Sequence, residues 1–450
     1  MVKIGLEIHG YLATNEKLFC RCAIEHGRKF SEPNTNICPV CTAQPGSKPL
    51  LPNDVAIKQV VKIGLILGCK ISERVVFQRK HYSWPDLPQG FQSTISGAHS
   101  MPNATGGKFG GIRITECHLE EDPAQWNPVS GEIDYNRSGA PLIEIVTEPD
   151  FKSSDEVVSW LSNLIATLSY VKSIDKNSGV KVDVNVSIDG GKRVEIKNIN
   201  SLKKIKDAIE NEVVRQEKDL PMVEETRMYD EEKKTTILMR TKDSALDYRF
   251  ISEPDLPSIE ISKETIEKIK SFIPELPLEK LKRLVKEHKI KEEYAKILTK
   301  NVFLVELFEN SLGKVKTEIL IPWITTELLG VANYNKIAVD EMEIDSEHFL
   351  ELLKAVESGQ INELKAKEIL RSWKEVSTSP KNEIVEGKKI SDDEIENLVR
   401  EAIDENSKAV DDYRAGEKSS LNFLIGVVMK KSNKRADSKK VKEALERILK

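Results

Sequence analysis

The hydrophobic pattern of the chain changes near Ile261, and this change constrains the fold more than any other feature. Before Ile261, short β-branched runs such as GIRITECHLE, KVDVNVSI and KRVEIKNI alternate apolar and polar residues, as half-buried strands do. Three helical stretches interrupt these runs, at 55–67, 155–170 and 202–218. After Ile261, apolar residues recur at spacings of three and four, which is typical of helices. We therefore predict an α+β domain built on an antiparallel sheet, followed by an all-α part.

The length of the chain indicates how these parts divide. At roughly 150 residues a domain, 450 residues suggest about three domains. Gly387, flanked by charges, marks a boundary within the helical part. We predict domains at 1–262, 263–388 and 389–450, with a cysteine-containing insertion at 20–41 in the first.

Charge and hydropathy exclude several classes of function. The net charge of −5 argues against attraction of the whole molecule to nucleic acid, so any such contact must be local. The N-terminal residues contain no signal-peptide core, and no run reaches the roughly 18 apolar residues of a membrane span. We expect a cytoplasmic protein with no membrane partner, whose cysteines are thiols or metal ligands rather than disulfides.

Four cysteines form two close pairs. Cys20 and Cys22 form C-x-C, Cys38 and Cys41 form C-x-x-C, and fifteen residues separate the pairs. Two thiol pairs at this distance can close a tetrahedral Zn²⁺ site. Four thiolates leave no open position for a substrate, so such a site would be structural. The alternative is four buried thiols without metal.

The strand-like segments carry many acids. Glu7 and His9 share one face of a strand by the period of two, and Asp183 alternates with valines in VDVNV. A sheet with one apolar and one acidic face can hold one or two Mg²⁺ ions, with nucleotide phosphates completing the ligand shell. The alternative is an ordinary solvent-facing side of a sheet. The candidate catalytic and Mg²⁺-binding residues are Glu7, His9, Glu121, Glu144, Asp183 and Glu195.

Common nucleotide and hydrolase motifs are absent from the sequence. It contains no G-x-x-x-x-G-K-[ST] loop, no kinase glycine-rich loop and no G-x-S-x-G. If the chain uses ATP, we expect it to do so on a sheet-and-metal site.

The C-terminal segment is basic. Residues 429–450 contain nine Lys or Arg against three acids. Lys430, Lys431, Lys434 and Arg435 cluster after the apolar run FLIGVVM. Such a cluster can bind RNA phosphates in a salt-dependent way. The alternative is a solvated helix end.

Several long motifs carry a family resemblance. The chain contains GLEIH, PNTNICPVC, FQRKHYSWPDLPQGFQ, GIRITECHLEED, DYNRSGAPLIEIVTEPD and VEIKNINS in this order. These motifs resemble the GatB family, the B subunits of glutamyl-/aspartyl-tRNA amidotransferases. The resemblance covers nearly the whole chain. It favours the B type over the related E type, because the chain runs directly from DLP into helices without an inserted domain.

The resemblance implies a fold and an activity. It implies a cradle domain similar to glutamine synthetase, a helical domain, and a small tail domain similar to YqeY that binds tRNA. ATP would phosphorylate Glu on tRNA(Gln), or Asp on tRNA(Asn). Ammonia from GatA, the amidase of the complex, would then displace phosphate, and the small protein GatC would complete a heterotrimer.

The resemblance also implies residue roles. The six acidic-face residues fall on family positions for the metal and kinase site. Lys80, in the motif Arg79-Lys80-His81-Tyr82, falls on the ammonia route. The alternative for Lys80 is a phosphate or surface contact.

Two other classes of function remain to be compared. One is a non-catalytic, zinc-containing tRNA-binding module, and the other is a free-standing amino-acid ligase of the glutamine synthetase type. The acidic face discriminates against the first, because acids repel phosphates. The basic tail discriminates against the second.

Overall fold

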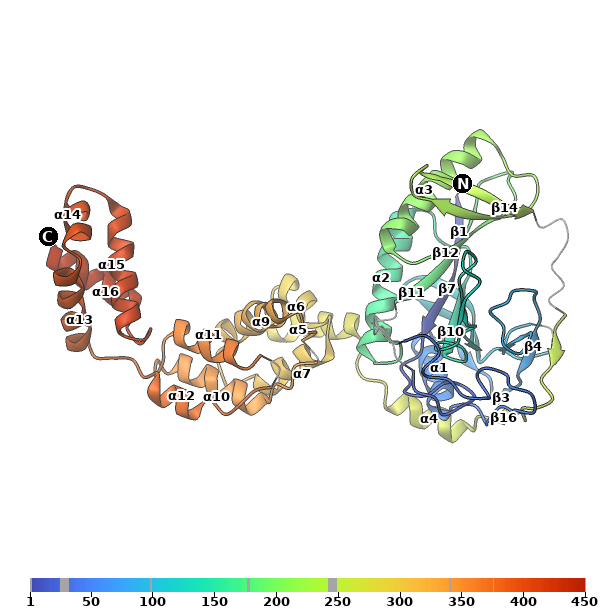
Figure 1. Ribbon diagram of the computed structural model, residues 1–450, viewed down its shortest axis with the longest axis horizontal. Coiled ribbons are helices and arrows are strands. Elements are labelled where there is room, and N and C mark those ends of the chain that lie inside the picture. The colour runs from blue at the N-terminus through green and yellow to red at the C-terminus, as the bar shows by residue number, and fades with distance from the viewer. Residues whose placement is uncertain are drawn as a thin grey trace. The chain divides into compact units, whose positions relative to one another are not determined.

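The computed structural model describes residues 2–24, 32–97, 99–175, 179–241, 249–339, 341–374 and 376–449. Residues 25–31 of the predicted insertion lie outside these ranges. The chain divides into two compact units, Met1–Leu276 and Pro277–Lys450. Figure 1 shows sheet and helix in the first unit and helices in the second. The predicted change near Ile261 is therefore confirmed in coarse form.

In the ranges that the structure describes, the first unit combines a large sheet with four helices. Its strands are β1 Lys3–Tyr11, β2 Lys70–Ile71, β3 Arg74–Val75, β4 Gln78–Lys80, β5 Gln92–Thr94, β6 Ala104–Phe109, β7 Ile112–Glu121, β8 Gln125–Trp126, β9 Ile133–Asp134, β10 Pro141–Thr147, β11 Val180–Ser187, β12 Val194–Ile199, β13 Glu225–Asp230, β14 Thr235–Thr241, β15 Ile251–Ser252 and β16 Ile259–Glu260. Its helices are α1 Asp54–Ile66, α2 Ser154–Tyr170, α3 Leu202–Lys218 and α4 Lys263–Ser271.

Among the described residues, the main sheet has 12 strands. Its order is β14-β13-β12-β11-β1-β10-β7-β5-β4-β15, and β6 joins β7 to β2. All of its ladders are antiparallel except β12–β13, which is parallel. The prediction of a purely antiparallel sheet is therefore wrong at this pair. The reason is α3, which follows β12 and returns the chain so that β13 runs in the same direction.

One face of the central strands is apolar and packs on α2 and α3. Ile8 and Ile145 are buried, and both line a small apolar space with Leu164 of α2. Helix α2 begins where the sequence predicts, because the Ser153 side chain accepts the Glu156 N–H. Helix α3 begins in the same way at Ser201 and packs against α2 (Figure 1). The helices thus cover the apolar face, which leaves the polar side chains on the opposite face.

The second unit is helical throughout its described residues. Its helices are α5 Pro277–His288, α6 Glu292–Leu298, α7 Val302–Ser311, α8 Thr317–Pro322, η1 Trp323–Leu328, α9 Leu329–Asn335, α10 Ser346–Glu357, α11 Glu363–Ser372, α12 Lys381–Glu386, α13 Asp392–Glu405, α14 Ser407–Arg414, α15 Lys418–Lys431 and α16 Ser438–Leu449.

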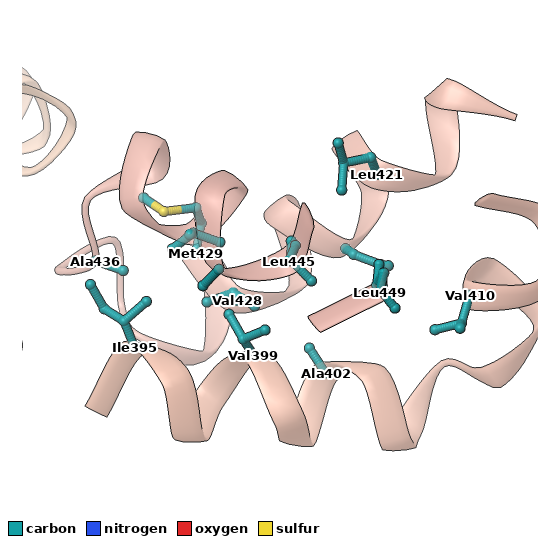
Figure 2. Close-up of a cluster of buried hydrophobic side chains, with 13 residues drawn as sticks. Ile395, Val399, Ala402, Val410, Leu421, Val428, Met429, Ala436, Leu445 and Leu449 are labelled. Atoms are coloured by element: carbon teal, nitrogen blue, oxygen red, sulfur yellow. The ribbon is translucent and has the colours of Figure 1, made fainter. Parts of the chain in front are cut away.

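The last four helices share a hydrophobic core (Figure 2). Val399 of α13, Leu424 and Val428 of α15, and Leu445 of α16 are all fully buried in it. A capping box between Ser391 and Glu394 begins α13. The apolar run FLIGVVM therefore supplies core residues to α15.

We expect Leu424→Ala to destabilise this core by about 2–5 kcal/mol, because a fully buried side chain would leave a cavity. The matched control is Phe423→Ala on the same helix, since Phe423 is 54% exposed. Hydrogen exchange of α13 to α16 would measure local opening in both variants. Equal protection in the two variants would contradict the packing described.

Candidate functional site

Side chains of four adjacent strands meet on the polar face of the main sheet. His9 of β1 lies opposite Glu144 of β10, which in turn lies opposite His118 of β7. On the other side of β1, Glu7 lies opposite Asp183 of β11. Because side chains alternate along a strand, these residues share one face. The predicted clustering of Glu7, His9, Glu144 and Asp183 is therefore present.

The first group of possible metal ligands comprises Glu7, Asp183 and Glu195, and we call it the Asp183 group. One ligand atom from each lies within 4.8 Å of the others. The Lys197 ammonium lies 2.5 Å from Asp183 Oδ2 and 2.5 Å from Glu195 Oε1. Asn185 Nδ2 donates to Glu7 Oε1 at 3.0 Å. Asp183 and Glu195 are buried.

Charge within the Asp183 group is unbalanced. Three carboxylates and one ammonium sum to −2 when all are ionised. Burial raises the pKa of Glu7, although the nearby Lys197 charge opposes this shift. Burial lowers the pKa of Lys197, but Asp183 and Glu195 outweigh it and the net shift is upward. A divalent cation would neutralise the group, and carboxylate oxygens are the ligands that Mg²⁺ prefers.

The second group comprises His9, Glu120 and Glu144, and we call it the Glu144 group. His9 Nε2 lies 3.5 Å from Glu144 Oε2, and His118 Nε2 lies 2.9 Å from the same oxygen. Thr94 Oγ1 donates to Glu120 Oε1 at 2.8 Å. His118 and Glu120 are buried, and Glu144 is only 13% exposed. Adjacent strands therefore place two carboxylates and an imidazole around one point.

The histidines and Glu144 stabilise one another's charged forms. Burial raises the pKa of Glu144, but the charges and hydrogen bonds of His118 and His9 together outweigh it, and the pKa falls well below its usual range. Burial lowers the pKa of His9, but its hydrogen bond to Glu144 and the nearby carboxylate charges together outweigh burial, and the net shift is upward. A histidine binds a metal ion only as neutral imidazole. A bound cation would therefore replace the proton on His9.

Glu121 lies on the other side of β7 from Glu120. Its Oε1 accepts the Ser93 N–H at 2.8 Å, and it belongs to neither group within the part of the chain that the structure describes. Burial raises the pKa of Glu121 to about 7. The sequence prediction groups Glu121 with Glu7 and His9, but the structure places it on the opposite face, because adjacent residues of a strand point to opposite faces. Glu120 occupies the place that the sequence prediction gave to Glu121.

Three residues of the site were missing from the predicted set: His118, Glu120 and Lys197. His118 and Glu120 alternate around Leu119, and Lys197 follows Glu195 by two residues. The period of two could have identified all three.

Lys80 lies beside the Glu144 group. It pairs with Gln92 between β4 and β5, and Gln92 Nε2 donates to Glu120 Oε2 at 3.3 Å. Burial and Glu144 raise the pKa of Glu120, but Lys80 and His118 outweigh them and the net shift is downward. Arg79 alternates to the other face, where it forms an ion pair with Glu253 at 2.8 Å. The Lys80 charge is therefore directed toward the acidic face.

The four predicted cysteines lie together. One sulfur from each of Cys20, Cys22, Cys38 and Cys41 lies within 4.8 Å of the others. The Cys38 N–H donates to Cys41 Sγ at 3.2 Å, and the buried Lys17 Nζ donates to the same sulfur at 3.3 Å. The hydrogen bond from Cys20, together with Lys17, lowers the pKa of Cys41 to about 4. This donor set fits a tetrahedral Zn²⁺ site.

We expect about one zinc per chain in elemental analysis of the purified protein. Cys38→Ser should lower zinc content and destabilise the first unit, because structural zinc contributes directly to folding. Cys69→Ser serves as a control, since Cys69 lies outside the four-sulfur group. A zinc-free protein with unchanged thermal stability would contradict the assignment.

The predicted basic cluster lies at the end of α15 and just after it, and Lys431 and Lys434 contact acids. Lys431 Nζ lies 3.0 Å from Glu401 and 2.6 Å from Glu405. Lys434 forms an ion pair with Glu368 of α11. RNA binding by Lys430, Lys431, Lys434 and Arg435 stays a prediction from the sequence.

Fold and site together place the chain among two-part proteins that can bind divalent cations on the face of a sheet. A mixed-sheet unit carries two groups that can hold divalent cations on one face, and a helical unit follows it in the chain. Among the described residues, no helix has the length and apolar content needed to cross a bilayer.

Comparisons with known proteins identify the family. Residues 2–267 match the GatB/GatE catalytic domain, and residues 306–449 match a GatB domain. The chain therefore belongs to the GatB/GatE family. It is similar to the B subunit of the aspartyl/glutamyl-tRNA(Asn/Gln) amidotransferase of Methanothermobacter thermautotrophicus, with 41% identity over 99% of this chain and 100% of that one. The Methanocaldococcus jannaschii protein of the same name is 42% identical over 100% of this chain and 98% of its own.

Proposed function

We propose that this chain is the component of a tRNA-dependent amidotransferase that uses ATP to phosphorylate the free carboxylate of Glu on Glu-tRNA(Gln), of Asp on Asp-tRNA(Asn), or of both. The observation that carries the proposal is the pair of ligand groups on one sheet face. Each group has the ligands and charge for a divalent cation. The names of the full-length relatives support the substrate.

The chemistry explains why such a face is needed. A carboxylate is a poor acyl donor, because its leaving group would be oxide. Transfer of the γ-phosphoryl group to a carboxylate oxygen releases ADP and makes an acyl phosphate. Ammonia then attacks the carbonyl carbon, and phosphate leaves with the electrons of the broken C–O bond. Mg²⁺ ions, when bound, neutralise the phosphate charge during the first step.

The residues of the face have separate roles in this proposal. Glu7, Asp183 and Glu195 would hold one Mg²⁺, and Lys197 would orient the last two carboxylates. The other Mg²⁺ would lie in the Glu144 group, between His9, Glu120 and Glu144. His118 would hold the orientation of Glu144. A catalytic role for Glu121 stays a prediction from the sequence, and the geometry supports Glu120 in its place.

The partners follow from the second substrate, ammonia. We propose that the amidase GatA supplies it, with the small protein GatC completing a heterotrimer. Lys80, directed toward Glu120, is our candidate for the end of the ammonia route. The finer domain assignments also belong to the proposal: a glutamine synthetase-like cradle at 1–262, a helical domain at 263–388, and a YqeY-like tail at 389–450.

The main alternative is a non-catalytic, zinc-containing tRNA-binding module. A buried face carrying five carboxylates, Glu7, Glu120, Glu144, Asp183 and Glu195, disfavours it, because such a face repels RNA phosphates. Phosphate release by the assembled complex separates the possibilities. Release that requires Glu-tRNA(Gln) or Asp-tRNA(Asn) supports the proposal. Release with free Glu or Asp indicates a free-standing ligase, and no release with any of these substrates indicates a binding module.

Neutralising Lys430, Lys431, Lys434 and Arg435 to Gln should weaken tRNA binding and lower its salt dependence. Removing one phosphate contact reduces the slope of log affinity against log salt by about one. Because Lys431 and Lys434 already contact acids, we expect the slope of log affinity against log salt to fall by less than about four. Lys296→Gln is the control, since Lys296 forms a similar surface pair with Glu292. An unchanged slope in the quadruple variant would contradict tRNA contact by this cluster.

A further inference from the structure

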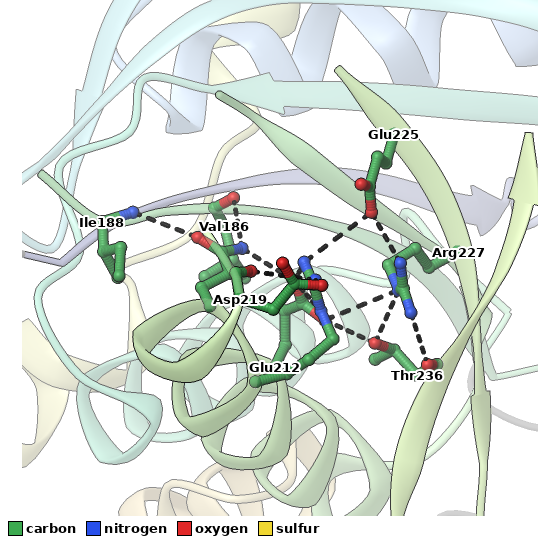
Figure 3. Close-up of polar contacts among 9 residues, drawn as sticks. Val186, Ile188, Glu212, Asp219, Glu225, Arg227 and Thr236 are labelled. Carbon is green, nitrogen blue, oxygen red and sulfur yellow. Dashed lines mark hydrogen bonds and ion pairs between the residues drawn. The ribbon is translucent and has the colours of Figure 1, made fainter. Parts of the chain in front are cut away.

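A fully buried carboxylate lies on α3, on the side of the sheet opposite the Asp183 group. Glu212 has no solvent exposure. It accepts from Arg215 Nη2 at 2.7 Å, from Gln216 Nε2 at 2.8 Å and from the Thr236 hydroxyl. Figure 3 shows Glu212 with the Thr236 side chain beside it. A buried carboxylate needs such donors, because removing a charge from water is costly.

The contacts of Glu212 extend to the strands packed against α3. Arg227 Nε of β13 lies 3.9 Å from Glu212 Oε2 and donates to Thr236 Oγ1 of β14 at 2.8 Å. Arg227 Nη1 also donates to Glu225 Oε2 at 2.6 Å. Gln216 Nε2 donates to the Val186 carbonyl of β11 at 3.3 Å. Glu212 thus joins α3 to β13 and β14, and its hydrogen-bond donor Gln216 joins the same helix to β11 (Figure 3).

The same stretch of β13 also contacts the Asp183 group. Thr226 lies opposite Glu195 in the parallel β12–β13 ladder. Its hydroxyl donates to Glu195 Oε2 at 3.2 Å, and both residues are buried. Since side chains alternate, Thr226 points to the polar face while its neighbours Glu225 and Arg227 point to the α3 side. A shift of β13 relative to α3 would therefore move the Thr226 hydroxyl relative to Glu195.

Strand β13 lies next to the last strand of the sheet, β14, and forms six residue pairs with it. Its ladder with β12 comprises four residue pairs. A bulge interrupts the β13–β14 ladder between Thr226 and Arg227. The side-chain contacts around Arg227 add a connection between this strand and α3 that the backbone ladders do not provide.

We propose that Glu212 is a positioning residue for the metal held by the Asp183 group: through Arg227 and Thr236 it fixes β13, so that Thr226 orients Glu195. This inference rests on the proposed function, in which Glu195 is a metal ligand. Groups that orient a metal ligand commonly change metal affinity by about 10–100-fold when removed. Glu212 acts one step further from the ligand than Thr226, so its effect should be smaller.

The test measures Mn²⁺ affinity of the full-length chain by titration. Every sample carries Glu144→Gln, so that the Glu144 group contributes no site. We expect Thr226→Val to weaken Mn²⁺ binding about tenfold, and Thr226→Ser to restore it, because serine keeps the hydroxyl. We expect Glu212→Gln to weaken binding about threefold or more. The double variant should be no weaker than Thr226→Val by more than about twofold, since both changes act through one contact.

Controls separate positioning from general loss of structure. Glu309→Gln removes a carboxylate that contacts Lys280 and Arg283 in the second unit, and it should leave Mn²⁺ affinity unchanged. If Glu212→Gln does not fold, Thr236→Val replaces it, because this variant removes one donor to Glu212. Unchanged Mn²⁺ affinity in folded Glu212→Gln, or in Thr236→Val where that variant replaces it, would overturn the inference. So would a double variant whose loss of affinity equals the product of the two single losses. Failure of the starting chain to bind Mn²⁺ would contradict the proposed function as well.

Discussion

Replacing Glu144 with glutamine is expected to lower the rate of tRNA-dependent ATP cleavage by about 100- to 1,000-fold or more, in line with the loss of one group that stabilises transition-state charge. Glutamine keeps the shape of the side chain but removes the charge that would hold Mg²⁺ and that His9 and His118 now contact. His9→Ala should act in the same direction. The measurement is phosphate release by the assembled complex with mischarged tRNA.

The Glu144 side chain is mostly buried, so its replacement could disturb folding. A control variant is therefore needed. Glu148→Gln provides it. Glu148 follows β10, accepts from Thr115 Oγ1 at 2.9 Å and lies outside both groups. Both variants should assemble with the amidase and leave its glutamine hydrolysis intact. Phosphate release at the unmodified rate by assembled Glu144→Gln complex would refute the placement of the site.

The second large effect separates two adjacent glutamates. Glu120→Gln should lower tRNA-dependent ATP cleavage by about 100-fold or more, because Glu120 belongs to the Glu144 group. Glu121→Gln should retain ATP cleavage, since the Glu121 carboxylate accepts from Ser93 N–H on the other side of β7. The sequence alone predicts the opposite for Glu121. Each variant is the control for the other, because both replace a glutamate of β7 and differ only in the face of the sheet on which that glutamate lies.

A reversed result would be informative. If Glu121→Gln abolished phosphate release and Glu120→Gln did not, the face assignment of β7 would be wrong. The Michaelis constant for Mg²⁺ gives a second readout. It should rise in Glu120→Gln and stay unchanged in Glu121→Gln, because only the first carboxylate is placed to bind the cation.

Much of the fold can be predicted from local patterns. The switch from alternating to helical periodicity near Ile261 identifies the sheet-containing part and the helical part, because each pattern reflects which side chains are buried. Ser153 and Ser201 are recognisable helix starts. Strand order and direction cannot be read in this way, since they depend on contacts between distant segments. The parallel β12–β13 pair is the example: the sequence shows a helix between two strands but not that they become neighbours.

The site residues, too, are predictable where they depend on one strand and unpredictable where they depend on pairing between strands. Alternation within one strand places Glu7 beside His9, and alternation within VDVNV places Asp183 on a face. Glu121 entered the predicted set through the family resemblance, whereas β7 continues to Glu121 and its alternation places Glu120 with His118. The pairing of Lys197 with both Asp183 and Glu195 depends on the register of β11 and β12, which no local pattern specifies.

Crystals of the chain soaked with Mn²⁺ and a non-hydrolysable ATP analogue would test the central claim most directly, because anomalous scattering locates each metal ion. We expect two Mn²⁺ peaks on the polar face, one among Glu7, Asp183 and Glu195 and one among His9, Glu120 and Glu144, with the triphosphate between them. A nucleotide bound elsewhere, with neither group occupied, would contradict it.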